Sequence, residues 1–132
     1  NFLWSATVDI RDQFYIGQYS LFDTSPVRFL PVDKNHSLLK KDIHGDKTLK
    51  TLGWFTNDFV NVMRRTDGKL QMNDLRFGTF SNSVNDENDF IFRFPIKLNT
   101  AGDYELLKVG KGPAEGNRKD MMGAIFDRIK GK

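Results

Sequence analysis

The stretch 69-KLQMNDLRFGTF-80 changes the phase of its hydrophobic alternation halfway along. Apolar residues occupy even positions up to Met72 and odd positions from Leu75 onward, and Asn73 and Asp74 separate the two phases. Successive side chains of a strand point to opposite faces, so a change of phase that keeps one face buried requires an extra residue. The pattern therefore predicts a strand with a β-bulge near Asn73 and Asp74.

Five other segments have the alternation, or the density of apolar and aromatic residues, that is typical of strands. They are residues 2–10, 14–22, 27–30, 59–65 and 90–98, and a weaker candidate lies at 104–109. The first segment alternates strictly, which favours a strand with an apolar face in the core and a polar face in water. The Asp67-Gly68 pair just before the opening stretch predicts a tight hairpin.

Helix signals occur midway along the chain and at its C-terminal end. Asn35 is a candidate N-cap for a helix over residues 35–43, and Asp46 is a candidate N-cap for a short helix that runs to Phe55. After Asn117, apolar residues recur at the spacing of an amphipathic helix. The expected fold class is therefore α+β: an antiparallel sheet of about six strands with helices inserted midway and at the C-terminus.

The length of 132 residues suits a single soluble domain, 1–132, that can bury a core of its own. No apolar run approaches the roughly 20 residues of a membrane-spanning helix. The net charge of +3 is spread along the chain, which argues against a nucleic-acid partner, because nucleic acid calls for a concentrated basic face. The chain begins with Asn1 rather than methionine, so we expect a fragment of a longer protein.

Asp74 and Arg76 lie two residues apart and therefore point to the same face of an extended strand. One interpretation is structural: they pair with each other or with cross-strand partners and hold the bulge in register. The other is a binding site, in which the Arg76 guanidinium clamps an anionic small-molecule substrate. In that interpretation Tyr15, Tyr19 and Asp23, on a neighbouring strand, complete the polar face.

The two histidines, His36 and His44, are eight positions apart, which is not the spacing of two ligands on one helical segment. Motifs for nucleophilic catalysis and phosphate loops are missing from the sequence, as is cysteine. No catalytic residue, metal or cofactor is therefore expected in this chain. His36 is a candidate contact for a substrate or partner, and either histidine, or Asp74, could complete a metal site whose other ligands lie elsewhere.

Four segments carry a resemblance to a known family: 15-YIGQYSLFD-23, 30-LPVDKNHSLL-39, 52-LGWFT-56 and 73-NDLRFGT-79. They resemble the C-terminal soluble part of YdjM/YbcI-type proteins, above all those of Bacteroidetes-like bacteria, over most of residues 4–94. That family is described as membrane-bound hydrolases that are predicted to depend on a metal. Its histidine motif lies in the N-terminal membrane-spanning part, so the resemblance places a divalent metal there and carries no ligand over to this chain.

The resemblance implies association with the bacterial inner membrane, with the protein's own N-terminal transmembrane region as partner. The expected function is that of a soluble accessory domain that contacts the hydrolase's substrate but is not active alone. The alternative is a protein- or ligand-binding module without hydrolase activity, using a sheet edge near Pro95 or the basic C-terminal helix. The mild basic excess slightly favours the cytoplasmic side of the membrane.

Overall fold

The computed structural model describes residues 3–20, 24, 26–79 and 83–107, and the helix expected after Asn117 lies outside these residues. In chain order the elements are β1 (Leu3–Ile10), β2 (Gln13–Ser20), β3 (Phe29–Asp33), the 3-10 helix η1 (His36–Leu38), α1 (Lys47–Phe55), β4 (Val60–Arg64), β5 (Leu70–Thr79), β6 (Phe90–Leu98) and β7 (Tyr104–Leu106). The described strands pair antiparallel throughout.

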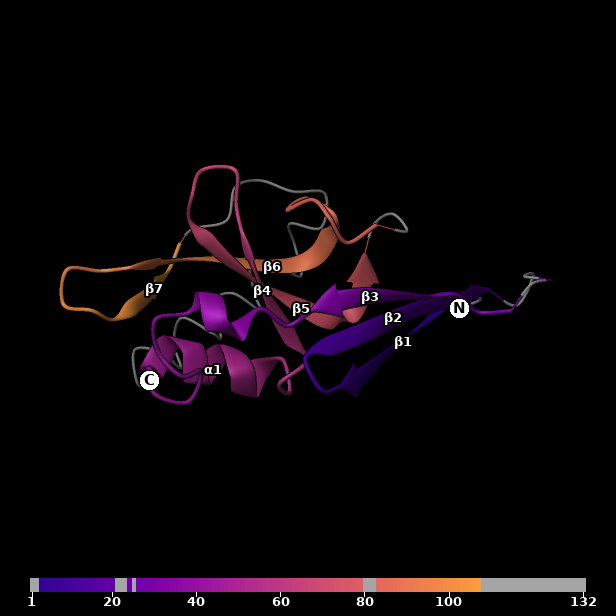
Figure 1. The fold of residues 1–132 in the computed structure, drawn as a ribbon, viewed down its shortest axis with the longest axis horizontal. Coiled ribbons are helices and arrows are strands. Elements are labelled where there is room, and N and C mark those ends of the chain that lie inside the picture. Colours follow the sequence, from indigo (N-terminus) through magenta and orange to yellow (C-terminus); the bar gives the residue numbers. More distant parts are fainter. Residues whose placement is uncertain (1–2, 21–23, 25, 80–82, 108–132) are drawn as a thin grey trace.

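The strands form two sheets, whereas the sequence predicted a single sheet of about six strands. The first sheet has the order β1-β2-β3 and the second sheet the order β4-β5-β6-β7, so each is a meander. The chain between β3 and β4 carries η1 and α1, and β4 starts a new sheet after them instead of pairing with β3. Figure 1 shows the first sheet at one end of the molecule and the β6–β7 hairpin at the other.

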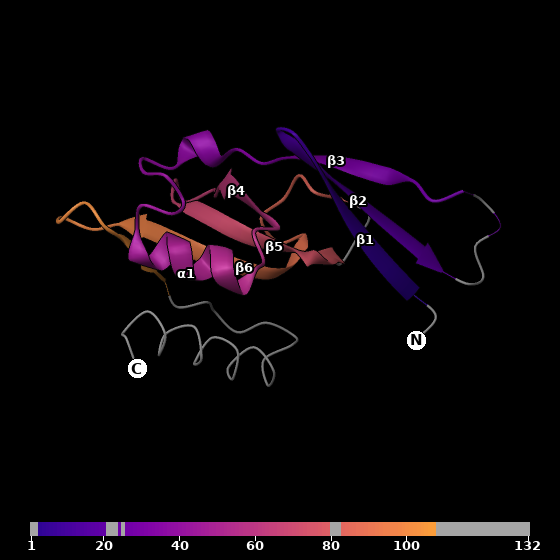
Figure 2. The same ribbon diagram turned by 90° about the horizontal axis from the view of Figure 1, so that it is seen from below.

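Two apolar cores lie on opposite faces of the second sheet. The helix core, between this sheet and α1 (Figure 2), contains Leu39, Leu49, Leu52, Val60, Val62, Met72, Phe94, Ile96 and Tyr104. The inter-sheet core, where the two sheets meet, contains Phe14, Ile16, Val32, Leu75 and Phe90. β5 contributes Met72 to the helix core and Leu75 to the inter-sheet core. Even-numbered and odd-numbered residues of a strand point to opposite faces, so these two side chains lie on different sides of the sheet.

β5 has a register irregularity that begins just after Asp74, next to the bulge that was predicted near Asn73 and Asp74. The register between β5 and β6 is regular through Asp74 and shifts between Asp74 and Thr79. On the β4 side, the amide of Leu75 still donates to the carbonyl of Phe59 at 2.9 Å. No extra residue is needed near Asn73, because both faces of β5 are buried and each phase of apolar residues has its own core.

β1 presents its apolar face to water, the reverse of the expected orientation. Val8 and Ile10 are 42% and 49% exposed. The polar face of β1 lies toward the second sheet, where the hydroxyl of Thr7 donates to the carbonyl of Leu75 at 2.7 Å. The alternation predicted the strand correctly but not its orientation, because β2 and β3 supply the first sheet's share of the inter-sheet core.

Only the short helix η1 forms where a helix over residues 35–43 was expected. Asn35 has left-handed backbone angles, with φ of 53°, and its side chain makes no capping hydrogen bond. Contacts with β4 hold this segment instead. The carbonyl of Lys34 accepts a hydrogen bond from the amide of Val62 at 2.9 Å, and Nε2 of His36 lies 2.8 Å from the carbonyl of Val60.

The start of α1 at Asp46 is as predicted. Oδ1 of Asp46 accepts hydrogen bonds from the amides of Thr48 and Leu49 at 2.9 and 3.1 Å, which is the bonding pattern of an N-cap. Oδ2 accepts a third bond, from the amide of Tyr104 at 2.9 Å, so the same side chain ties α1 to β7. Across the ranges that the structure describes, no helix is both long enough and apolar enough to cross a membrane.

Pro95 lies in β6, which is a central strand between β5 and β7 and not an edge. Its carbonyl accepts a hydrogen bond from the amide of Leu107 at 2.8 Å, one position beyond the last residue of β7. In an antiparallel pair the nitrogen and the carbonyl of a residue face the same neighbour, so the missing N–H of Pro95 faces the end of β7. Pro95 therefore limits the β6–β7 ladder without disturbing the β5 side.

Candidate functional site

Asp74 and Arg76 form an ion pair on the face of β5 that looks toward α1. The side chain of Asp74 is fully buried and that of Arg76 is 33% exposed. Nε and Nη2 of Arg76 donate to the two carboxylate oxygens at 3.0 and 2.7 Å, and its guanidinium lies 5.6 Å from the centre of the Phe55 ring. The hydrogen bonds that Arg76 donates to Asp74 raise the pKa of Arg76. The structure thus shows the pairing, and clamping of an anion by Arg76 stays a prediction.

The other predicted contacts do not gather around this pair. Tyr15 belongs to the first sheet, on the face of β2 that points away from the inter-sheet core, so it does not neighbour β5 in a sheet. Tyr19 is paired with Trp4 in the β1–β2 ladder, and Asp23 lies outside the described residues. His36 is in η1, beside β4. Their roles as substrate or partner contacts stay predictions.

Metal ligands are not assembled in the described part of the chain, where no three histidine or carboxylate side chains gather around a potential metal position. His36 is half-buried against β4, and His44 is exposed in the turn before α1. A metal site that one of these histidines or Asp74 completes together with further polypeptide remains a prediction.

A chain of buried amides crosses the face of the second sheet that is turned away from α1. Nη1 of Arg65 donates to Oε1 of Gln71 at 2.6 Å, and Nε2 of Gln71 donates to Oδ1 of Asn73 at 2.6 Å. Nδ2 of Asn73 then donates to Oδ1 of Asn61 at 3.0 Å. A second bond from Gln71 reaches the carbonyl of Glu87 at 3.0 Å, so the 83–89 loop is attached to the same chain. This network satisfies buried polar groups and acts as a structural support.

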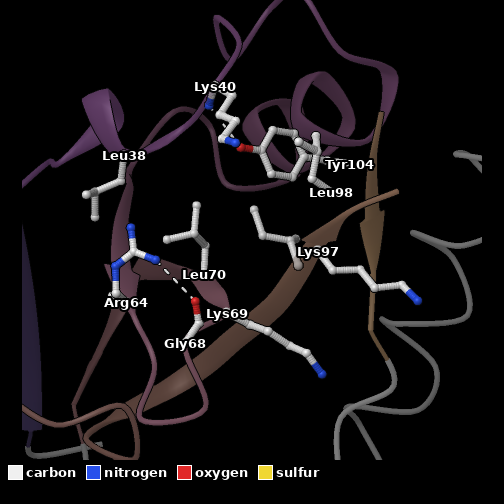
Figure 3. Close-up of a pocket in the computed structure, with 10 residues that line it drawn as sticks. Leu38, Lys40, Arg64, Gly68, Lys69, Leu70, Lys97, Leu98 and Tyr104 are labelled. Atoms are coloured by element: carbon white, nitrogen blue, oxygen red, sulfur yellow. Dashed lines mark hydrogen bonds between the residues drawn. The ribbon is translucent and has the colours of Figure 1, made fainter. Parts of the chain in front are cut away.

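A pocket of about 250 Å³ opens where the β4–β5 turn and the β6–β7 hairpin meet the segment after η1 (Figure 3). Ten described residues line it: Leu38, Lys40, Arg64, Gly68, Lys69, Leu70, Ile96, Lys97, Leu98 and Tyr104. The strand register explains how distant parts of the sequence meet here. Leu70 is paired with Ile96 across β5 and β6, and Leu98 is paired with Tyr104 across β6 and β7.

The charged residues of this basic pocket are all cationic: Lys40, Arg64, Lys69 and Lys97. Lys97 lies 3.8 Å from Glu105 in an exposed pair, which neutralises it weakly. Within the described ranges, the ammonium groups of Lys40 and Lys69 have no carboxylate at ion-pair distance. The ten described lining residues include no aspartate or glutamate. The described acidic groups near these cations are Asp67, which interacts electrostatically with Lys69, and Glu105, which lies near Lys97, and both stand outside the lining.

Tyr104 gives the basic pocket a fixed wall. It is only 4% exposed, and its ring belongs to the helix core. Its hydroxyl accepts a hydrogen bond from the amide of Lys40 at 2.9 Å, and its own amide donates to Asp46. The segment that carries Lys40 is thus held against β7 through backbone groups, which leaves the lysine side chain free to follow a ligand.

Sequence reasoning missed the basic pocket. Its four cations come from four separate places in the sequence, at turns and strand ends, where charged residues are usually exposed to solvent. The one available signal was the Arg64–Lys69 pair, which flanks the predicted 66–68 turn and therefore had to place two cations at the same end of a hairpin. The approach of Lys40 and Lys97 depends on tertiary contacts.

Comparisons with protein-family models, with curated proteins and with solved structures found no match. The resemblance to YdjM/YbcI-type proteins therefore rests on the quoted sequence segments alone. What the domain does has to be argued from its own geometry.

Proposed function

We propose that this domain is a binding module for a small anionic ligand, which it holds in the basic pocket. The observation that carries the proposal is the described lining, which contains four cationic side chains and no acidic one. Apolar walls around a concave surface concentrate the field of such charges, and this raises the local concentration of anions. Lys69 interacts electrostatically with Asp67 of the neighbouring turn. Among the described residues, however, neither Lys40 nor Lys69 has a carboxylate at ion-pair distance, so an anion can approach both without breaking an ion pair.

The same pocket would serve the accessory role that the family resemblance implies. In that role the domain would hold the anionic substrate of a membrane-bound hydrolase while the metal chemistry takes place in the membrane part. Asp74 and Arg76 would then support the fold from β5, since neither lines the pocket. The proposal of a binding module stands without this parentage and can be tested on the isolated chain.

The test is a titration of the isotope-labelled chain with inorganic phosphate, followed by the amide signals in NMR. We expect saturable shifts at Lys40, Gly68, Lys69 and Lys97, and weakening as sodium chloride is added. The double variant Lys40→Gln/Lys69→Gln should bind phosphate about tenfold more weakly, since each exposed charge contact contributes up to about 1 kcal/mol.

The matched control is Lys47→Gln/Lys50→Gln, which removes the same charge from two exposed lysines of α1 that do not line the pocket. It should leave phosphate binding unchanged. Equal weakening by both double variants, or shifts scattered over lysines outside the pocket, would show that phosphate senses only the net charge, and the proposal would be dropped.

A further inference from the structure

We propose that the ligand of the basic pocket is an amphiphile: a short apolar chain that ends in one anionic group, either a carboxylate or a phosphate. This inference rests on the proposed function and adds the chemical class of the ligand. It comes from the way in which apolar and charged lining residues are distributed between the floor and the mouth of the pocket.

The floor of the pocket is apolar. Ile96 is fully buried and Tyr104 nearly so, while Leu38 and Leu70 are half-buried. Leu98, at 38% exposure, continues this surface outward. Ile96 and Tyr104 have almost no surface left to bury, so the accessible apolar surface comes from Leu38, Leu70 and Leu98. A hydrated inorganic anion would leave the surface of these three leucines in contact with water. An apolar chain laid on it would remove both surfaces from water, which is the main source of favourable free energy in such sites.

The cations lie at the mouth. Figure 3 shows the side chains of Lys69 and Lys97 extended away from the floor, with their ammonium groups at the outer ends, and Arg64 on the other side of the pocket. Long cationic side chains commonly place their methylene stems along apolar surface and keep the charge in water. Lys69 and Lys97 extend toward the same side, so a ligand whose anionic group lies near these two ammonium groups can lay an apolar remainder on the leucine surface.

Sugars and nucleobases match the lining less well. Apart from the hydroxyl of Tyr104, which already accepts a bond from Lys40, the lining has no uncharged polar side chain. A sugar or a base needs several such groups for orientation, and a base also needs an exposed ring to stack on. Tyr104 is too buried to offer its ring face. The volume of about 250 Å³ falls below the roughly 300–1,000 Å³ of sites for drug-sized ligands, so the chain is short.

Calorimetric titration with acetate, butanoate and octanoate, each below its micelle concentration, tests the ligand class. Affinity should rise with chain length, by up to about fourfold for each methylene that becomes buried. Octyl phosphate should bind like octanoate, whereas neutral octyl glucoside should bind much more weakly than either.

A matched pair of variants places the chain in the pocket. Leu98→Ser should lower the ratio of octanoate affinity to acetate affinity several-fold and leave acetate binding unchanged. Val8→Ser removes a side chain of similar exposure, 42% against 38%, from the outer face of β1, and should leave the ratio unchanged. Equal ratios in wild type and Leu98→Ser would overturn the proposed placement.

The outcomes separate this inference from the proposed function. If phosphate binds at the pocket and octanoate binds no more tightly than acetate, the amphiphile is wrong and the anion-binding module stands. If no anion shifts the NMR signals of the pocket amides, both the proposed function and the amphiphilic ligand are wrong. Phosphatidylcholine vesicles with and without phosphatidylglycerol show whether the natural ligand is a membrane lipid or a soluble molecule. If the anionic vesicles compete with octyl phosphate, the ligand is a lipid. If the vesicles do not disturb octyl phosphate binding, the ligand is soluble. Vesicle binding that octyl phosphate fails to displace would overturn the inference.

Discussion

Asp74 and Arg76 lie two positions apart on β5, yet one is fully buried and the other one-third exposed, and two parallel hydrogen bonds of 3.0 and 2.7 Å join them. A carboxylate this deep in the protein keeps its charge at an acceptable free energy only with a partner of opposite charge. The regular β5–β6 pairing ends at Asp74, and Arg76 reaches this carboxylate from within the stretch up to Thr79 where the register shifts. The pair therefore fixes the conformation of β5 where the sheet becomes irregular.

Arg76→Ala should destabilise the protein, because it leaves the buried carboxylate of Asp74 without a counter-charge. Removing one partner of a buried ion pair costs about 3–5 kcal/mol of folding free energy. We expect a value at the low end of this range, because water can enter the space that Arg76 leaves and solvate the carboxylate of Asp74. Urea unfolding should show the loss with an unchanged m-value. The double variant Asp74→Asn/Arg76→Ala should recover part of it, and Lys50→Ala should show no change. An Arg76→Ala variant as stable as the wild type would show that the pair is not a structural support.

Asn61→Ala and Asn73→Ala should each destabilise the protein, and their effects should not add. Each change removes the hydrogen bond between Nδ2 of Asn73 and Oδ1 of Asn61 and leaves one of these two buried atoms without that partner, which costs about 1–3 kcal/mol. Once one asparagine has been replaced, the hydrogen bond between the two side chains is already lost, so replacing the second costs less. A double-mutant cycle should therefore give a coupling free energy of about 1 kcal/mol. Strictly additive losses in urea unfolding would contradict the direct contact between the two side chains.

Asp46→Ala should destabilise the protein by about 3 kcal/mol, since the helix cap and the acceptor for the Tyr104 amide are lost together. Asp46→Asn should lose about half as much, because one oxygen remains to cap α1 while an amide nitrogen cannot accept from Tyr104. Thermal unfolding of both variants beside Lys47→Ala, an exposed position in the same helical turn, measures the difference. An Asp46→Asn variant as stable as the wild type would show that Asp46 is only a cap, and equal losses for alanine and asparagine would show that the asparagine oxygen does not cap α1.

The carboxyl of Asp67 should titrate below its ordinary pKa of 3.8, because the amide of Lys69 and then the side chain of Arg65 donate to its charged form. The folded pKa is thus lower than the unfolded one, so the unfolded chain binds more protons between the two values. The stabilisation is complete above the ordinary value and is lost as pH falls through the folded pKa. Carbon-detected NMR titration of the carboxyl gives this value directly, and a midpoint at or above 3.8 would contradict the turn geometry.

Local signals in the sequence were enough to place several elements. Asp46 is followed by a helix, because a carboxylate before a run of helix-compatible residues can bond the first free amides without help from elsewhere. The Asp67-Gly68 turn joins β4 and β5 as predicted, with φ of 83° at Gly68. Gly17 in β2 lies under Phe29, whose ring carbon would be 2.7 Å from an added Cβ, so a residue without a side chain is needed there.

The features that the sequence did not place depended on partners far away in the chain. The bulge near Asn73 and Asp74 was predicted on the assumption of one buried face, whereas β5 has a core on each face and its register irregularity begins just after Asp74. The alternation in β1 was assigned the wrong orientation for the same reason. Asn35 looks like a cap, and yet its segment is held by β4 through Lys34 and His36.

The amino-acid sequence by itself determined where the strands and α1 form, because hydrophobic period, turn residues and caps act within a few positions of one another. Only the tertiary structure decided which face of each strand is buried, that the strands divide into two sheets, and that Lys40, Arg64, Lys69 and Lys97 surround one apolar floor. The physical reason is that alternation defines two faces without saying what will cover them. Burial is a property of pairs of elements, and the pairs that matter here join residues that lie far apart in the chain.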